Sequence, residues 1–167
     1  MTIDQNIILI GMPGSGKSTI GVLLAKVLSR DFVDTDLLIQ AAEGRRLQET
    51  IDSDGLDDFL ALEERHVLAL DVQGAVIATG GSVVYSEEAM RHLKRRGTVV
   101  YLLLPMSDLE ARITDMDSRG VVIAPWQTLA DLYHERLPLY EHFADITIDC
   151  AGLSHGQVVQ AILEALA

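Results

Sequence analysis

Apolar and polar positions follow one another along this chain in blocks that predict strands and helices in turn. Short apolar runs typical of buried strands span residues 6–10, 30–36, 75–79, 98–104 and 144–150. Apolar residues recur at helical spacing in segments 19–28, 37–43, 47–51, 56–70, 86–97, 126–143 and 155–167, and a capping-type start at Ser107 predicts another helix. We expect the helix within 126–143 to be interrupted at Pro138.

This alternation predicts an α/β fold with a five-stranded, mostly parallel sheet and helices on both faces. A length of 167 residues suits a single domain spanning 1–167. Ligands of such folds bind at the carboxyl ends of the strands. Four of the five predicted strands lead there into chemically useful segments, which are residues 11–18, 34–36, 80–81 and the stretch that carries Arg112 and Arg119.

The segment after the first strand has the pattern G-x-x-x-x-G-K-[ST]. It comprises Gly11, Gly14, Ser15, Gly16, Lys17 and Ser18, with Thr19 next in the helix that follows. Glycines let backbone N–H groups converge on one anion, and the helix start adds its positive dipole end. We expect Lys17 to reach the β and γ phosphates and the Ser18 hydroxyl to ligate Mg²⁺. The sequence therefore predicts an ATP-binding phosphate loop.

Composition narrows the partners. The chain carries 13 basic and 25 acidic residues, a net charge of −12, which disfavours nucleic acid. No apolar run approaches the about 18 residues that span a bilayer, so we expect no membrane partner. The first strand follows the N-terminus without a basic leader, which favours a cytoplasmic location. Cys150 is expected to be a buried small hydrophobic residue, and nothing indicates a dimer seam, so we expect a monomer.

The acidic pair after the second strand gives the phosphate loop its chemistry. Asp34 is the nearest carboxylate that could bind Mg²⁺, and Asp36 is then left to orient an acceptor hydroxyl and take its proton. A helix N-cap with a helpful first-turn charge is the alternative interpretation of this pair. Guanine-binding N-K-x-D is absent from the sequence, and the strand that would carry the acid of a motor ATPase ends in Thr79-Gly80-Gly81.

Together with the phosphate loop, the segments 34–36, 78–81 and 135–140, followed by Ala144-Asp145, make the chain resemble the shikimate kinase family over nearly its whole length. The resemblance implies a P-loop fold like that of nucleoside monophosphate kinases, with a mobile lid at about 113–125. It also implies ATP and Mg²⁺ as cofactors, and transfer of the γ-phosphate to a hydroxyl of a small cyclic acid, with shikimate as the best single guess.

The same resemblance implies roles for single residues. Asp34 would hold Mg²⁺ through water, Asp36 would bind the acceptor hydroxyl, and backbone groups of Gly80 and Gly81 would contact the acceptor. Three arginines would complete the site: Arg136 would pair with the acceptor carboxylate, Arg119 of the lid would stabilise the transferring phosphoryl group, and Arg112 would stack on adenine.

The chain departs from the family pattern in three places. Leu60 stands where the family has an arginine that helps Arg136 grip the carboxylate, Ser82 replaces a third glycine, and residues 119–122 read Arg-Gly-Val-Val instead of Arg-Pro-Leu-Leu. Loss of one charge-assisted contact predicts about 10- to 150-fold weaker shikimate binding. A carbohydrate or polyol kinase and a nucleotide-sensing module without turnover are the alternatives. Substitute cations could come from Arg45, Arg46 or Arg65, although solvated helix charges are the favoured interpretation of all three.

Overall fold

The computed structural model describes residues 5–112, 123 and 127–167. Its elements in chain order are β1 (Asn6–Ile10), α1 (Lys17–Leu28), β2 (Phe32–Asp34), α2 (Thr35–Glu43), α3 (Leu47–Asp54), α4 (Leu56–Leu68), β3 (Val76–Ala78), the short 3₁₀ helix η1 (Val83–Tyr85), α5 (Glu87–Arg96), β4 (Gly97–Leu103), α6 (Met106–Arg112), α7 (Leu129–Phe143), β5 (Ile146–Asp149) and α8 (His155–Leu166).

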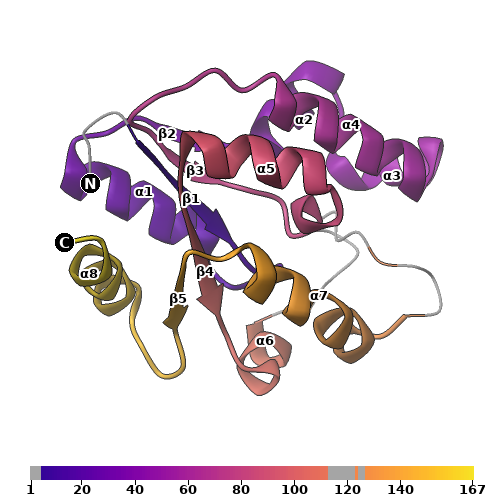
Figure 1. Ribbon diagram of the computed structural model, residues 1–167. Coiled ribbons are helices and arrows are strands. Elements are labelled where there is room, and N and C mark those ends of the chain that lie inside the picture. Colours follow the sequence, from indigo (N-terminus) through magenta and orange to yellow (C-terminus); the bar gives the residue numbers. More distant parts are fainter. Residues whose placement is uncertain (1–4, 113–122, 124–126) are drawn as a thin grey trace.

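The five strands form one sheet in the order β2-β3-β1-β4-β5, and every neighbouring pair is parallel. Strand β1 is buried along its whole length, as a central parallel strand with both faces covered must be. Helices α1 and α8 pack together on one side of the sheet, while α5 and α7 lie on the other (Figure 1). The predicted α/β fold is therefore confirmed.

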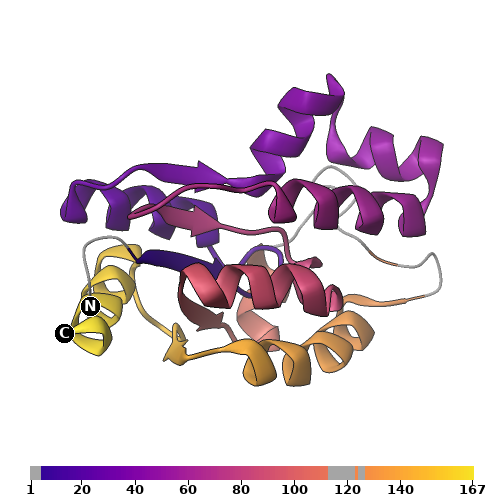
Figure 2. The same ribbon diagram turned by 45° about the horizontal axis from the view of Figure 1, so that its top comes forward.

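Helices α2, α3 and α4 form a group of their own beyond the carboxyl ends of the strands, visible at the upper right of Figure 2. They enclose a small second core of Ile39, Leu47, Phe59 and Leu62. This group brings α4 beside η1 and α5, close to the segment that follows β3. These helices therefore cover the carboxyl edge of the sheet on the side of β2 and β3.

Two local predictions were wrong. Helix α7 continues through Pro138, because this exposed proline only removes one hydrogen bond, to a carbonyl of the equally exposed His134 that water can reach. Helix α6 begins at Met106, so Ser107 lies inside the first turn and does not cap it; the amides of Asp108 and Leu109 donate instead to the carbonyl of Pro105. Neither difference alters the predicted order of the strands.

Polar contacts of Asp145 hold the β5 edge of the sheet in place. Asp145 accepts hydrogen bonds from Lys94 Nζ at 2.7 Å and from the amide of Val99 at 2.9 Å, which ties β5 to α5 and β4.

Cys150 is buried, as predicted. Within the described residues, no helix is both long and apolar enough to cross a bilayer.

Candidate active site

The phosphate loop between β1 and α1 has the shape that anion binding requires. Gly11, Gly14 and Gly16 have positive φ angles of 146°, 82° and 95°, and a β-carbon on Gly11 would lie 2.8 Å from the carbonyl oxygen of Leu102. Gly16 gives α1 no side-chain cap, and its first turn has no acidic residue. The first amides of α1 are therefore left for an anion from outside the helix.

Two side chains of the loop add to this cradle. The Ser15 hydroxyl is buried and has no hydrogen-bond partner among the described residues. Lys17 is only 8% exposed, and its Nζ donates to the carbonyls of Gly11 at 2.8 Å and Met12 at 2.9 Å. Burial lowers the pKa of Lys17 to about 8, partly offset by the nearby charge of Asp36. A polyphosphate would supply the anionic partner that this buried ammonium lacks.

Ser18 and Asp34 meet at the start of two helices. The Ser18 hydroxyl donates to Asp34 Oδ2 at 2.6 Å. The other carboxylate oxygen of Asp34 accepts from the amides of Asp36 at 3.0 Å and Leu37 at 3.3 Å, so Asp34 is the N-cap of α2. Ser18 and Asp34, the two residues predicted to bind Mg²⁺, therefore lie in contact. Asp34 also has the capping role that the alternative interpretation gave to the acidic pair.

Asp36 lies in the first turn of α2 and lines the same cavity as the phosphate loop. Burial raises its pKa to about 6, the neighbouring charge of Asp34 raises it further, and Lys17 opposes the shift. A carboxylate with this pKa is a competent base near neutral pH, where it is mostly ionised yet holds a proton more readily than an exposed aspartate.

Gly80 and Gly81 follow β3 and pack too closely for side chains. The Gly80 amide donates to Thr35 Oγ1 at 3.1 Å, and a β-carbon on Gly80 would lie 2.8 Å from Asp36 Oδ1. A β-carbon on Gly81 would meet Pro13 at 2.9 Å and Arg136 Nη1 at 3.0 Å. These two glycines thus let the phosphate loop, Asp36 and Arg136 converge.

Arg136 projects from α7 into this convergence and is fully buried. Its Nε donates to the Tyr85 hydroxyl at 3.1 Å, and its guanidinium lies 5.0 Å from the centre of the Tyr85 ring. Tyr140, one turn further along α7, donates its hydroxyl to the Gly81 carbonyl at 2.6 Å. The guanidinium is therefore held by aromatic neighbours from η1 and its own helix.

One cavity of about 770 Å³ contains most of these groups. The predicted residues that line it are Gly14, Gly16, Lys17, Ser18, Thr19, Asp36, Gly80, Gly81, Arg112 and Arg136. Gly11 and Ser15 support the loop from within, and Asp34 contacts the cavity-lining Ser18. Arg119 and the predicted lid 113–125, except Ile123, lie outside the described residues.

Sequence reasoning missed several lining groups. His155 at the start of α8 lines the cavity beside Gly16, and Leu47 and Phe59 line it from α3 and α4. Tyr85 and Glu63 were also missed. One feature of the sequence could have pointed to a role for Glu63: it lies three residues after Leu60, on the same face of a predicted helix. A single acidic residue on a helix is otherwise indistinguishable from a solvated one.

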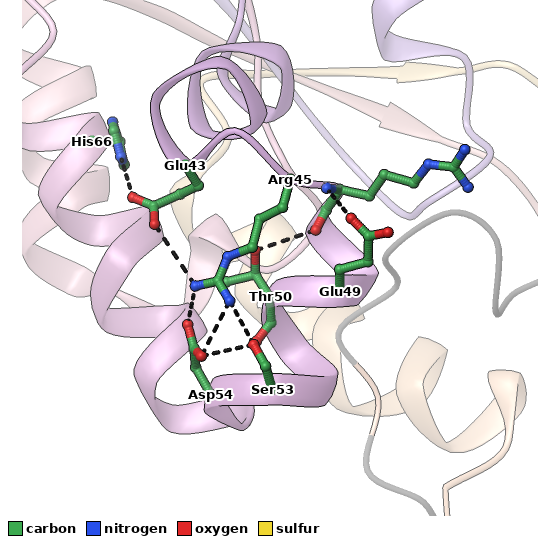
Figure 3. A network of polar contacts seen from close by, with 8 residues as sticks. Glu43, Arg45, Glu49, Thr50, Ser53, Asp54 and His66 are labelled. Atoms are coloured by element: carbon green, nitrogen blue, oxygen red, sulfur yellow. Dashed lines mark hydrogen bonds and ion pairs between the residues drawn. The ribbon is translucent and has the colours of Figure 1, made fainter.

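None of the three substitute arginines lines the cavity. Arg45 is bound in a network on α2 and α3, where it pairs with Asp54, donates to Ser53 Oγ at 2.5 Å and lies 3.8 Å from Glu43 (Figure 3). Arg46 and Arg65 are exposed. Among the described residues, Arg112 and Arg136 are the arginines that line the cavity. The interpretation of the other three as surface charges is confirmed.

Comparisons with known proteins agree with this arrangement. The family profile described as "Shikimate kinase" matches residues 13–167. The shikimate kinase of Pasteurella multocida is 42% identical over 153 residues, covering 89% of this chain and 87% of that protein, and that of Thermodesulfovibrio yellowstonii is 36% identical over 163 residues, covering 96% and 94%.

Solved structures extend the match to three dimensions. A shikimate kinase from Acinetobacter baumannii in complex with shikimate superimposes with a TM-score of 0.88 at 30% identity, covering 97% of this chain and 92% of that one. A thymidylate kinase from Candida albicans, at 13% identity and a TM-score of 0.62, shares the fold alone. A matching family profile, curated relatives and solved structures lead to one conclusion: the chain belongs to the shikimate kinase family.

Proposed function

We propose that this kinase transfers the γ-phosphoryl group of ATP to a hydroxyl of a small hydroxylated acid, with shikimate as the first acceptor to test. One observation carries the proposal: the phosphate loop, Asp36, the Gly80-Gly81 turn and Arg136 border the same cavity of about 770 Å³. The relatives named shikimate kinase support the choice of acceptor.

The donor side is formed by the phosphate loop. The amides at the start of α1 and the Lys17 ammonium would bind the β and γ phosphates, which also gives the buried Ser15 hydroxyl a partner. Thr19 and Arg112 would line the nucleotide site, with the Arg112 guanidinium over the adenine ring. The predicted role of Arg119 in stabilising the transferring group is kept as part of the proposal.

The acceptor side is formed by Asp36, the two glycines and Arg136. Arg136 would hold the carboxylate of the acceptor, and Gly80 and Gly81 would leave room for its ring. Asp36 would accept the hydroxyl proton while that oxygen forms its bond to the γ phosphorus and the bond between this phosphorus and the ADP oxygen breaks. Little else is needed from the protein, since phosphoryl transfer depends mainly on positioning and charge.

The chemistry of Ser18 and Asp34 fits Mg²⁺. A hydroxyl and a carboxylate within 2.6 Å of each other beside a phosphate loop are the oxygen ligands that Mg²⁺ takes together with phosphate oxygens and water. When bound, the ion would neutralise charge on the β and γ phosphates. Asp34 would keep its capping bonds to α2 while its Oδ2 turns to the metal's hydration shell.

We also propose that the protein acts as a cytoplasmic monomer. The phosphate loop, Asp36, Gly80, Gly81 and Arg136 of a single chain border one cavity, which supports a monomer, and the reaction would draw on intracellular ATP. Size-exclusion chromatography with light scattering tests the monomeric state.

A coupled assay of ADP release tests the function. Shikimate, quinate, gluconate and simple polyols are supplied in turn with ATP and Mg²⁺, with Lys17→Met as the inactive control. Release that depends on an acceptor and is lost in the control supports the proposal. The polyol alternative gains support from Leu60, because the site lacks the family's second arginine, and preferential turnover of polyols would favour it.

A further inference from the structure

The wall of the acceptor side contains a carboxylate that neither the motif nor the proposed reaction uses. Glu63 on α4 is only 3% exposed. Its Oε2 accepts a hydrogen bond from the Ser82 hydroxyl at 2.6 Å, while no donor among the described residues contacts its Oε1. An ionisable oxygen buried without a donor is costly unless a ligand provides one.

The position one turn earlier on α4 explains the missing partner. Residue 60 lies three positions before Glu63, where an arginine of the kind that the family pattern places there would come within reach of the carboxylate. Leu60 instead packs against the small core under α2, α3 and α4. Ser82, which replaces a glycine of the family pattern, supplies the one hydrogen bond that Glu63 receives.

Glu63 Oε1 points toward the acceptor groups. A β-carbon on Gly80 would lie 2.3 Å from this oxygen and 2.8 Å from Asp36 Oδ1, so both carboxylates pack against Gly80 where another residue would carry its side chain. Gly80 and Ser82 line the large cavity, and Glu63 lines an adjoining one of about 210 Å³ that shares Ser82 with it. Glu63 is thus one glycine away from the acceptor base.

An acceptor whose only charge is one carboxylate does not balance the charged groups on the acceptor side of the cavity. Asp36 and Glu63 contribute two carboxylates, and the cations whose charges act on Glu63 are Arg136 and Lys17. With Lys17 engaged by the phosphates, an acceptor whose only charge is a carboxylate would pair with Arg136 and leave no cation in contact with Glu63. An acceptor that also has an ammonium group would pair with both.

We propose that Glu63, held by Ser82, is a specificity-determining residue that selects hydroxylated acceptors carrying an ammonium group in addition to a carboxylate. The ammonium would donate to Glu63 Oε1 in the space beside Gly80, while Arg136 holds the carboxylate and Asp36 faces the hydroxyl. This inference rests on the proposed phosphotransferase function and names its acceptor class.

Titration of Glu63 sharpens the inference. Burial raises the pKa of Glu63 to about 7; the Ser82 hydrogen bond opposes this shift, the Asp36 charge adds to it, and Arg136 and Lys17 oppose it. The Tyr140 hydroxyl, which donates to the Gly81 carbonyl, stays protonated, because burial raises its pKa to about 12 and the charge of Glu63 adds to this shift. The carboxylate form that binds an ammonium therefore grows as the pH rises through about 7.

Matched pairs of acceptors test the idea directly. L-homoserine and 4-hydroxybutanoate differ in one amino group, as do L-serine and 3-hydroxypropanoate, and shikimate serves as the acceptor without a cation. We expect kcat/KM with ATP and Mg²⁺ to be about 10- to 150-fold higher for the amino member of at least one pair. That ratio should rise between pH 6 and 8, because Glu63 ionises in this range. Titration of Lys17 affects both members of a pair equally and cancels in the ratio.

Variants assign the preference to Glu63. Glu63→Gln should abolish the ratio within each pair, whereas Asp58→Asn, which removes an exposed charge from the same helix, should leave it unchanged. Leu60→Arg should supply the internal cation and shift preference from the amino acceptor to shikimate. Thermal unfolding verifies that each variant is folded. If Glu63→Gln does not fold, Leu60→Arg still tests the inference, because it changes the partner of Glu63 and leaves Glu63 itself in place.

The outcomes separate the two proposals. If shikimate is phosphorylated but amino acceptors are not preferred over their matched partners, the inference about Glu63 is wrong and the kinase assignment stands. An amino-acceptor preference that survives in Glu63→Gln also overturns the inference. If no acceptor raises ADP release above the Lys17→Met control, the proposed function fails and the inference fails with it.

Discussion

The donor and acceptor sides of the cavity are constructed in different ways. The proposed donor side is one continuous segment, residues 11–18, whose positive φ angles and helix start have the form that phosphate binding requires. The acceptor side draws Asp36 from α2, Gly80 and Gly81 from the turn after β3, and Arg136 from α7. A local backbone shape tolerates little change, whereas an assembled pocket can change one wall while the others stay.

The departures from the family pattern follow this division. Leu60 and Ser82 both lie on the acceptor side, where they adjoin Glu63, while every residue of the phosphate-loop pattern is present. ATP use and acceptor choice are therefore separable properties of this chain, and substitutions on each side should affect different kinetic constants.

The largest effect is expected on the acceptor side, from Asp36→Asn. Loss of the base should lower kcat about 100- to 10,000-fold, with little change in the affinity for ATP. In the unmodified protein, kcat/KM should fall as the pH drops below about 6, because the pKa of Asp36 is raised to that value and only its ionised form accepts a proton. Initial rates between pH 5 and 8 measure this limb, and an unchanged kcat in the variant would exclude Asp36 as the base.

On the donor side, Lys17→Met should lower kcat about 100- to 1,000-fold, the usual cost of removing one charged donor from a transition state. ATP binding should weaken as well, whereas binding of the acceptor alone should not change. Lys26→Met, an exposed position on the same helix, is the matched control. Equal losses in both variants would indicate damage to α1 instead of a lost phosphate contact.

A smaller effect that isolates the acceptor side is expected for Arg136→Met. Loss of the charge-assisted contact should raise the acceptor KM about 10- to 150-fold while the KM for ATP stays within about twofold. Arg112→Met is the matched arginine control, and it should show the reverse pattern, since Arg112 borders the proposed nucleotide side. The comparison between the two sides fails if both variants alter the same constant.

The smallest effect is expected for Tyr85→Phe. This change removes the hydroxyl that contacts Arg136 Nε at 3.1 Å and keeps the ring that lies against the guanidinium. A hydrogen bond from a charged donor is worth about 1.5–3 kcal/mol, and only part of this should reach the acceptor because the guanidinium keeps its contact with the ring. The acceptor KM should therefore rise about two- to tenfold with kcat unchanged. Tyr133→Phe, three residues before Arg136 on α7 and not among the cavity-lining residues, is a suitable control.

Sequence reasoning succeeded where a property is local. The glycines of the phosphate loop, the order of strands and helices, and Asp36 are all set by residues close together in the chain. It failed where distant segments meet. Glu63 lies 19 residues from Ser82, and only their contact in the fold distinguishes it from an ordinary helix charge. Continuation of α7 through Pro138 was missed because exposure of the affected carbonyl decides the outcome.

The bond between Ser18 and Asp34 bears on the kinetic order of the reaction. It joins the first turn of α1, on the proposed nucleotide side, to the residue that caps α2, which carries the proposed base. A nucleotide and metal that engaged the Ser18 hydroxyl would break its bond to Asp34, and the start of α2 beside Asp36 would adjust. We therefore expect the donor substrate to prepare the acceptor side, and steady-state rates should show that bound ATP tightens acceptor binding.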